Sequence, residues 1–250
     1  MNVMERIFAL GEGIGRTVDL AFPPTCLGCG GLVENNPPYR HICATCLPTL
    51  ARVTPPYCGV CGHPFFGEVE GERICPHCVD LRPWFRSGCT AVLLRGPARA
   101  MIIELKYHHG LHVLADIEII VRESPHLLNH LKDAVLVPVP LHVRKERERG
   151  YNQSQLLAEA FARAAGGRTG VARLLARTAD TMTQTAFDRR SRMANLKNAF
   201  ALAPGSRILP DQHYILVDDV FTTGSTLNSC ASVLRDAGVV RLDVATFGHG

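Results

Sequence analysis

The stretch that decides the fold lies at residues 213–226 and reads HYILVDDVFTTGST. Four apolar residues at 214–217 come first, and the adjacent carboxylates Asp218 and Asp219 follow them. An apolar run of this length predicts a strand buried on both faces of a parallel sheet. Open α/β sheets bind ligands beyond the carboxyl ends of such strands, so we expect the functional site beside Asp218 and Asp219.

The residues after this strand predict a phosphate site. Four hydroxyl side chains surround one glycine, in the order Thr222, Thr223, Gly224, Ser225 and Thr226. Just before a helix, their N–H and hydroxyl groups can converge on a phosphate whose charge the helix dipole favours. The two carboxylates would repel a phosphate and instead suit ribose hydroxyls or a divalent cation. The combined ligand is a ribose 5-phosphate, with or without magnesium; the alternative is an ordinary buried strand followed by a capped helix.

The composition is that of a globular protein with an uneven charge. Of the 250 residues, 46% are hydrophobic and 20% are charged, which argues against a disordered chain. The net charge is +4, and the excess of Lys and Arg lies after residue 85, together with the phosphate motif. An anionic substrate or a nucleic acid would be attracted there, although a solvated surface can carry the same excess. Charged residues interrupt the apolar stretches, so we expect no signal peptide, no membrane span and a cytoplasmic protein.

Residues 1–24 predict an amphipathic N-terminal helix. Apolar residues recur at spacings of three and four between residues 3 and 22, and Pro23 and Pro24 end the pattern. The polar face carries both signs of charge, so we expect this helix to pack on its own protein rather than on a membrane.

Residues 25–80 predict two structural zinc sites. They contain four Cys-x-x-Cys pairs, which are Cys26/Cys29, Cys43/Cys46, Cys58/Cys61 and Cys75/Cys78, and the second two pairs repeat the first two at an offset of 32 residues. This spacing is typical of zinc ribbons, whose folding energy comes largely from the metal. A disulfide framework fits a cytosolic chain poorly, and iron–sulfur ligation is less typical of repeated knuckles. The spacing leaves open whether neighbouring or interleaved pairs share a metal.

From residue 81 onward the pattern alternates between strands and helices. Strands are predicted at 88–94, 133–140, 171–175, 214–217 and 239–247, and helices at 97–123 with a break at Gly110, at 153–164 and at 224–237. Such alternation is typical of an α/β domain with a mostly parallel sheet. We expect this domain to span residues 81–250.

A second group of candidate site residues follows the strand at 133–140. Four cations lie within residues 144–149, on a predicted loop that leads to the next helix. A loop at the carboxyl end of a strand is placed to hold an anion. Arg149 offers a guanidinium fork, Gly150 permits close backbone approach and Asn152 offers an amide donor, so we assign them to a pyrophosphate. Lys106 either stabilises the end of the preceding helix or reaches the same substrate, and both interpretations stay open.

The polar connection at residues 177–198 is the third candidate element. Its cationic and amide side chains are Gln184, Arg189, Arg190, Arg192, Asn195 and Lys197. A connection of this length in a compact domain is typically a lid or a disordered segment. A lid would exclude water from a reactive ribosyl centre, whereas a solvated charged loop would have no such role.

In combination these motifs resemble those of the ComF family. They occur in the order of doubled Cys-x-x-Cys ribbons, LKY at 105–107, VPVPLH at 137–142, RGYNQS at 149–154, Arg192 with Asn195, and VDDVFTTGST at 217–226. The last motif is similar to the phosphoribosyl pyrophosphate (PRPP) signature of type I phosphoribosyltransferases. The resemblance covers nearly the whole chain, although many members of the family have only four metal-binding cysteines.

This resemblance implies a fold, a ligand and a cellular role. The implied fold is a type I phosphoribosyltransferase-like α/β domain, with a mostly parallel five-stranded sheet flanked by helices and a small N-terminal double zinc ribbon. The implied ligand is PRPP with magnesium, and the implied role is in natural competence and the use of imported single-stranded DNA. The predicted catalytic residues are Asp218, Asp219 and Arg149, and the predicted substrate-binding residues are Val220, Thr222, Thr223, Gly224, Ser225, Thr226, Lys106, Gly150, Asn152 and Arg192.

Two hypotheses of different classes follow. In the first, the protein is a magnesium-dependent phosphoribosyltransferase that uses PRPP. In the second, the transferase scaffold has no catalytic role and binds single-stranded DNA or proteins of the DNA-uptake machinery, since a fold alone does not establish catalysis. No residue identifies the acceptor in the first hypothesis.

Overall fold

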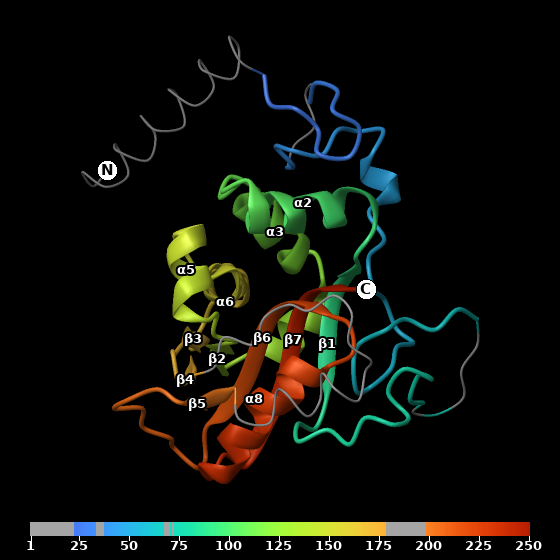
Figure 1. Cartoon of the computed structure of the whole chain (residues 1–250). Coiled ribbons are helices and arrows are strands. Elements are labelled where there is room, and N and C mark those ends of the chain that lie inside the picture. The colour runs from blue at the N-terminus through green and yellow to red at the C-terminus, as the bar shows by residue number, and fades with distance from the viewer. Residues whose placement is uncertain (1–22, 34–37, 68–70, 72, 179–198) are drawn as a thin grey trace, which may run out of the picture.

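The computed structural model describes residues 23–33, 38–67, 71, 73–178 and 199–250. The helix predicted within residues 1–24 lies outside these ranges, as does most of the predicted lid, including Arg192 and Asn195. Figure 1 shows a central sheet with helices on both sides and the C-terminus at one end of its strands.

A five-stranded parallel sheet forms the centre of the protein. In sheet order its strands are β1 (Gly88–Leu93), β7 (Arg241–His249), β6 (His213–Phe221), β2 (Val135–Pro138) and β3 (Gly170–Val171). Each neighbouring pair in this order is parallel, so the predicted sheet is confirmed. The central strand β6 extends beyond its apolar residues because its pairing with β7 continues as far as Phe221 and His249.

Helices cover both faces of the sheet. One face carries α2 (Gly96–Tyr107), α3 (Val113–Arg122), α4 (Pro125–Leu131) and α6 (Gln153–Ala165), and the other face carries α8 (Ser225–Asp236). Alternate residues of β6 enter the two cores, as side chains of a strand must: Ile215 packs in the first and Leu216 in the second. The central strand is therefore buried on both sides, as its apolar sequence predicts.

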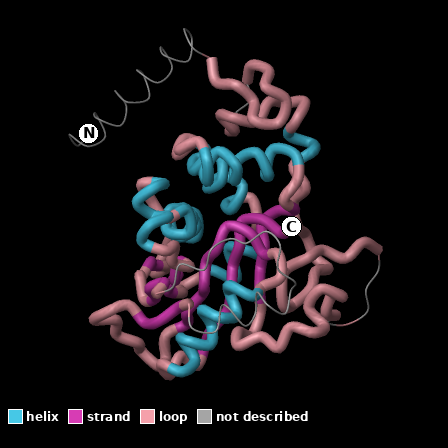
Figure 2. Tube along the Cα trace, viewed as in Figure 1, coloured by secondary structure: helices cyan, strands magenta, loops and turns pink. Residues whose placement is uncertain are grey.

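The two cysteine repeats lie on different sides of this sheet. We call residues 25–46 the first ribbon and residues 57–78 the second ribbon. Tyr39 and Ile42 of the first ribbon pack in the core of α2, α3, α4 and α6. The cysteines of the second ribbon pack in the core of α8. In Figure 1 the first ribbon lies beyond α2 and the second lies beside β1, and Figure 2 shows that both consist mainly of loops and turns.

The segment between the ribbons passes along the edge of the sheet. After the short 3-10 helix η1 (Leu47–Thr49), the backbone N–H of Val53 donates to the carbonyl of Ala91 at 2.9 Å. The N–H of Leu93 donates to the carbonyl of Ala51 at 2.8 Å. The chain thus covers the edge strand β1 on its way from one face to the other.

Three elements differ from the sequence-based expectation. The predicted loop at 141–152 contains the helix α5 (Val143–Arg149), and the helix α4 was not predicted. The strand predicted at 171–175 is divided between β3 and β4 (Leu175–Arg177), and β4 pairs antiparallel with β5 (Phe200–Leu202) outside the main sheet. Within the described part of the chain, no helix has the length and apolar character needed to cross a membrane.

Candidate functional site

The candidate site lies where the connections of the sheet change direction. The chain leaves β2 through α6 on one face to reach β3, and it leaves β6 through α8 on the opposite face to reach β7. The neighbours β2 and β6 therefore diverge at their carboxyl ends, and such a switch point opens a crevice for ligands in α/β sheets. Asp218 and Asp219 lie at this end of β6.

Asp218 and Asp219 are held by the first turn of α6. The hydroxyl of Ser154 donates to Asp218 Oδ1 at 2.8 Å, and the side-chain amide of Gln153 donates to Asp219 Oδ1 at 3.3 Å. The backbone N–H of Asp219 also donates to Asp218 Oδ1, at 2.9 Å. Only 4% of Asp219 is exposed, so its charge is stabilised almost entirely by protein groups.

Lys106 supplies the opposite charge. It lies in the last turn of α2, and its ammonium forms an ion pair with Asp219 Oδ2. The structure thus places Lys106 in contact with Asp219 while it also lies at the end of α2, and a direct contact with substrate stays a prediction. The two carboxylates and this lysine form one charged cluster.

The pKa of Asp218 is raised to about 7. Burial of the carboxyl group is the main cause, and repulsion from the neighbouring charge of Asp219 adds to it. The hydrogen bonds from Ser154 and the Asp219 N–H, together with the charge of Lys106, act in the opposite direction and are outweighed. A second cation or a set of hydroxyl donors beside Asp218 would favour its ionised carboxylate. The aspartate pair is therefore suited to binding a cation or a ligand with several hydroxyl groups.

The predicted phosphate loop, residues 222–226, joins β6 to α8. Gly224 has φ of 70°, a left-handed conformation that favours glycine, and it lies at the N-cap of α8. The hydroxyls of Thr223 and Ser225 are 2.9 Å apart, and the N–H of Ser225 donates to Thr223 Oγ1 at 3.4 Å. The first N–H groups of the 12-residue helix α8 have no intrahelical acceptors. Hydroxyls and N–H groups therefore gather here, as an anion site requires.

Arg149 reaches the carboxylates through an intermediate residue. It ends α5, and its guanidinium donates to the side-chain oxygen Oε1 of Gln153. The amide nitrogen Nε2 of Gln153 in turn donates to Asp219 Oδ1. The same guanidinium lies 5.9 Å from the ring centre of Tyr107. The structure thus brings Arg149 and the aspartate pair into one hydrogen-bonded chain.

Gly150 and Asn152 have clear structural tasks. Gly150 ends α5 with φ of 79°, which is the left-handed conformation typical of a helix end. Asn152 caps α6: its side-chain oxygen accepts from the N–H of Ser154 at 3.0 Å, and its amide donates to the carbonyl of Val139 at 2.9 Å. The contacts of Asn152 fix the start of α6 and hence Ser154; a direct substrate role for Gly150 or Asn152 stays a prediction.

Val220 and Arg192 are two further predicted site residues. Val220 is half-buried and packs against the core of α2, α3, α4 and α6, so its side chain supports the strand. Arg192 lies outside the described residues. Gln153 and Ser154 were not predicted as site residues, and the sequence signal that could have identified them is their place directly after Asn152 at a helix start.

The eight cysteines form two four-cysteine groups. They are Cys26, Cys29, Cys43 and Cys46 in the first ribbon, and Cys58, Cys61, Cys75 and Cys78 in the second, with all ligand atoms of a group within 4.8 Å of one another. Neighbouring pairs therefore share a site, and the interleaved arrangement is excluded. The Sγ atoms of Cys29 and Cys43 are 3.7 Å apart and those of Cys61 and Cys75 are 3.6 Å apart. Tetrahedral Zn–S bonds of about 2.3 Å require S···S distances of about 3.8 Å, so both groups fit zinc.

Backbone N–H groups point at the sulfurs in both ribbons. The N–H of Cys43 lies 3.3 Å from Cys26 Sγ, and the equivalent N–H of Cys75 lies 3.3 Å from Cys58 Sγ. Burial alone would raise the pKa of Cys26, but these backbone hydrogen bonds outweigh it and lower that pKa to about 7. The thiolate form of Cys26, which is the form that binds zinc, is thus favoured before the metal is considered.

Comparison with known proteins agrees with this description. A family model described as a double zinc ribbon domain matches residues 17–79. The chain is 29% identical to competence protein F of Haemophilus influenzae over 228 residues, which cover 88% of this chain and 94% of that protein. It is 31% identical to the DNA utilization protein YhgH of Escherichia coli O6:H1 over 210 residues, which cover 81% of this chain and 88% of that protein.

Two further matches are less similar in sequence. Competence protein ComFC of Bacillus subtilis is 24% identical over 217 residues, which cover 80% of each chain. A solved hypoxanthine phosphoribosyltransferase of Staphylococcus aureus aligns with 53% of this chain and 62% of its own, at 14% identity and a TM-score of 0.33. With its two four-cysteine zinc sites and its likeness along most of its length to the competence and DNA utilization proteins named above, the chain belongs to the ComF family of competence and DNA-utilisation proteins.

Proposed function

We propose that this protein binds PRPP and acts as a phosphoribosyltransferase. The observation that supports this most is the placement of an aspartate pair and a hydroxyl-rich loop on one strand–helix connection at the switch point of the sheet. The loop at residues 222–226 would bind the 5-phosphate, and Asp218 and Asp219 would bind the ribose hydroxyls. The likeness to type I phosphoribosyltransferase signatures points to the same assignment.

The residues of the site have separate tasks in this proposal. In phosphoribosyl transfer the bond between the anomeric carbon and pyrophosphate breaks while a bond to the acceptor forms, and positive charge develops on the ribose. The carboxylates of Asp218 and Asp219 would stabilise that charge, and Arg149 and Lys106 would stabilise the departing pyrophosphate. Two adjacent carboxylates also provide the oxygen ligands that magnesium prefers, and the metal would add positive charge beside the pyrophosphate.

The cellular setting is part of the proposal. Relatives of this chain are named as competence or DNA utilization proteins, and we place its function in the uptake or use of DNA, within the cytoplasm. We keep the predicted division into an N-terminal helix at 1–24, a double ribbon at 25–80 and a transferase-like domain at 81–250.

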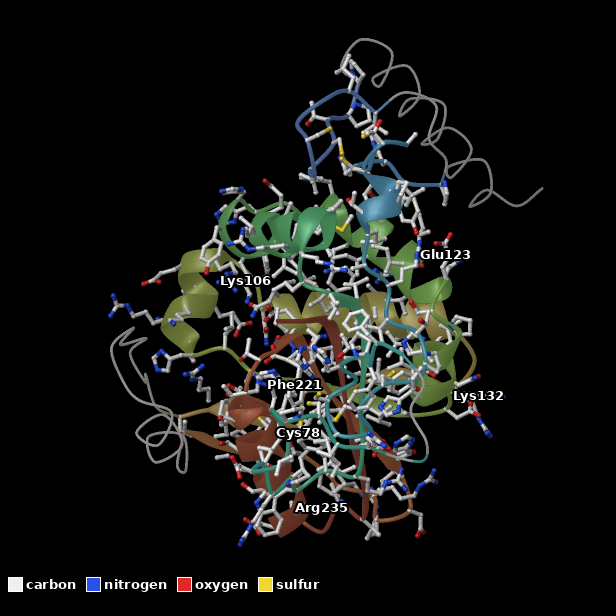
Figure 3. All side chains as sticks on the ribbon, turned by 90° about the vertical axis from the view of Figure 1, so that its right-hand side faces the viewer. Cys78, Lys106, Glu123, Lys132, Phe221 and Arg235 are labelled. Carbon is white, nitrogen blue, oxygen red and sulfur yellow. The ribbon has the colours of Figure 1, made fainter. Side chains whose placement is uncertain are left out.

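Isothermal titration with PRPP, with and without magnesium, tests the proposal. We expect saturable binding that magnesium strengthens and that the double variant Asp218→Asn/Asp219→Asn abolishes. The variant Lys132→Ala, which alters an exposed lysine on the far side of the molecule from Lys106 in Figure 3, should bind as the wild type does. The absence of PRPP binding under both conditions would reject the function. Release of pyrophosphate with bases, nucleotides or DNA as acceptors would then establish catalysis.

A second function is favoured by the exposed helix α5. This helix has no buried residue, and its cations Arg144, Lys145 and Arg147 lie at the same end of the sheet as the site. Such a surface can follow a nucleic-acid backbone, so the second function is the binding of single-stranded DNA without catalysis. Binding that weakens with salt and is lost on neutralising these three residues, in a protein that releases no pyrophosphate, would support this second function.

A further inference from the structure

We infer that the second ribbon is a positioning element for the phosphate loop: its metal-bound form holds residues 221–228 in their binding conformation, and the first ribbon has no such task. This inference rests on the proposed function for its ligand, PRPP, but not for its structural basis. Three separate sets of contacts join the second ribbon, with the short segment that follows it, to the loop and the start of α8.

The first contact is between Leu81 and Gly224. Leu81 follows directly from the metal site, since its N–H donates to the carbonyl of Cys78 at 3.0 Å. A Cβ atom on Gly224 would lie 3.0 Å from Leu81 Cδ2 and 2.6 Å from Phe221 Cζ. The left-handed turn of the phosphate loop is thus enclosed between a leucine attached to the ribbon and the last residue of β6.

The second contact fixes the first turn of α8. The side chain of Asn228 accepts a hydrogen bond from the N–H of Trp84 at 2.7 Å and donates one to the carbonyl of Arg82 at 3.2 Å. One side chain therefore satisfies two backbone groups of the segment that leaves the ribbon. The carbonyl of Trp84 also accepts from Arg235 Nε at 2.6 Å, which joins the same segment to the far end of α8.

The third contact runs through stacked rings. The N–H of His63 points at Cys61 Sγ at 3.4 Å, and the His63 ring lies edge-on to His249 with centres 4.8 Å apart. His249, at the end of β7, stacks on Phe221 with centres 5.5 Å apart and planes 15° from parallel. Phe221 is the residue directly before the phosphate loop, so these ring contacts join the second ribbon to the start of the loop.

The second metal site is more deeply buried than the first. All four cysteines of the second ribbon are buried and share one apolar core with Phe221 and Leu227. In the first ribbon Cys29 is exposed and two further cysteines are half-buried. Loss of the second zinc would leave four unliganded thiols inside the core that packs against the loop. Because the metal supplies most of the folding energy of such ribbons, we expect this part of the core to become less stable.

The first ribbon contacts other elements. The N–H groups of Arg40 and His41 donate to the buried carboxylate of Asp116 on α3, at 2.9 and 2.7 Å. Tyr39 donates to Glu123 at the end of the same helix. These contacts join the first ribbon to α3 and its C-terminal end rather than to the start of α8, so this ribbon provides a matched control within one chain.

The repeat provides a direct test. Cys61→Ser/Cys78→Ser removes two ligands of the second site, and Cys29→Ser/Cys46→Ser removes the equivalent pair 32 residues earlier. Each full-length variant should contain one zinc instead of two. In the second-site variant we expect amide exchange in residues 221–228 to rise about tenfold or more, and the emission of Trp84, the single tryptophan, to shift. In the first-site variant the amide exchange of residues 221–228 and the emission of Trp84 should match those of the wild type.

PRPP titration of the same variants gives the functional readout. The second-site variant should bind PRPP at least about tenfold more weakly, and the first-site variant within about twofold of wild type. Leu81→Ala keeps all eight cysteines and covers the case in which the second-site variant fails to fold: it should retain two zincs yet weaken PRPP binding. Its control, Leu50→Ala, removes an equally buried leucine next to the first ribbon and should leave PRPP affinity unchanged.

The outcomes separate the inference from the proposed function. If the wild type does not bind PRPP, the proposed function fails, and amide exchange at 221–228 still decides whether the second ribbon supports the loop. If the wild type binds PRPP but the second-site variant and Leu81→Ala match it in exchange and affinity, the inference is overturned. Equal effects of the two metal sites would also overturn it.

Discussion

The ammonium of Lys106 is ion-paired with the buried carboxylate of Asp219, which joins the last turn of α2 to the carboxyl end of β6. The carboxylate of Asp219 also accepts a hydrogen bond from Gln153, and Gln153 in turn accepts one from Arg149. The lysine offsets a carboxylate charge that is otherwise almost fully enclosed by protein. The last turn of α2, the first turn of α6 and the carboxyl end of β6 are thereby fixed relative to one another.

Replacement of Lys106 by alanine should weaken PRPP binding and lower the stability of the free protein. The substitution removes a cation from the proposed pyrophosphate side and leaves Asp219 without its ion partner, which typically costs a few kcal/mol for a buried pair. Titration calorimetry and thermal unfolding measure the two effects. Lys132→Ala is the control, and equal behaviour of the two variants would contradict the assignment of Lys106.

Replacement of Asp218 by asparagine should stabilise the ligand-free protein increasingly as the pH rises. The folded-state pKa of Asp218 is about 7, above its ordinary value of 3.8, so folding favours the protonated form. Its contribution to stability is full below about pH 4 and is lost as the pH rises through 7. The melting temperature of the variant relative to wild type should therefore increase between pH 6 and 8, by roughly 2–6 °C. A difference in melting temperature that does not change with pH would show that the carboxyl of Asp218 is not perturbed.

Replacement of Asp243 by asparagine should destabilise the fold without touching the site. Asp243 is buried and accepts hydrogen bonds from Arg86 Nη2 and His213 Nε2, both at 2.7 Å, at the opposite end of the sheet. Burial alone would raise the pKa of Asp243, but these two partners outweigh it and hold the pKa well below its usual range. Removing one member of such a network costs roughly 2–4 kcal/mol, measurable by urea unfolding at pH 7.

The pH dependence of that loss has a definite sign. Because the folded-state pKa is depressed, the stabilisation by Asp243 is present above the unfolded pKa of about 4 and is lost as the pH falls further. The gap between wild type and variant should therefore narrow in acid. Asp133→Asn, which alters an exposed ion pair with Arg168 at 3.5 Å, should change stability by less than about 0.5 kcal/mol.

Replacement of Gly224 by alanine should cost more than its conformation alone explains. Gly205 has a similar left-handed φ of 76°, but a Cβ there would meet no atom within 4 Å. Gly205→Ala should cost about 1 kcal/mol, and Gly224→Ala about 2–3 kcal/mol because its Cβ would also press on Phe221 and Leu81. Thermal unfolding compares the two, and equal losses would mean that the loop has room to relax.

The sequence predicted the parts of this site that a single segment encodes. The strand, carboxylates and hydroxyl loop of residues 213–226 are contiguous, and the cysteine spacing specifies two four-ligand sites. The helix α5 was missed because its sequence VRKERER has no apolar stripe, and the structure gives it no buried residue.

The contacts that the sequence did not predict within the site are tertiary contacts. The contact of Lys106 with Asp219 requires α2 to end beside β6, and the contact of Ser154 with Asp218 requires α6 to begin there. The cysteines of the two ribbons have the same spacing. The local sequence therefore does not show that the first ribbon packs on the helices and the second packs near the phosphate loop. Their burial against different cores appears only once the sheet has formed.

The binding of the 5-phosphate by residues 222–226 is the central claim, and phosphorus NMR of PRPP at saturating protein tests it most directly. The 5-phosphate and the two pyrophosphate phosphorus atoms give separate resonances, each with its own bound shift. The variant Thr223→Val/Ser225→Ala should return only the 5-phosphate resonance toward its free position, and Arg149→Ala should do so only for the pyrophosphate resonances. A bound 5-phosphate shift that is unchanged in Thr223→Val/Ser225→Ala would contradict the account.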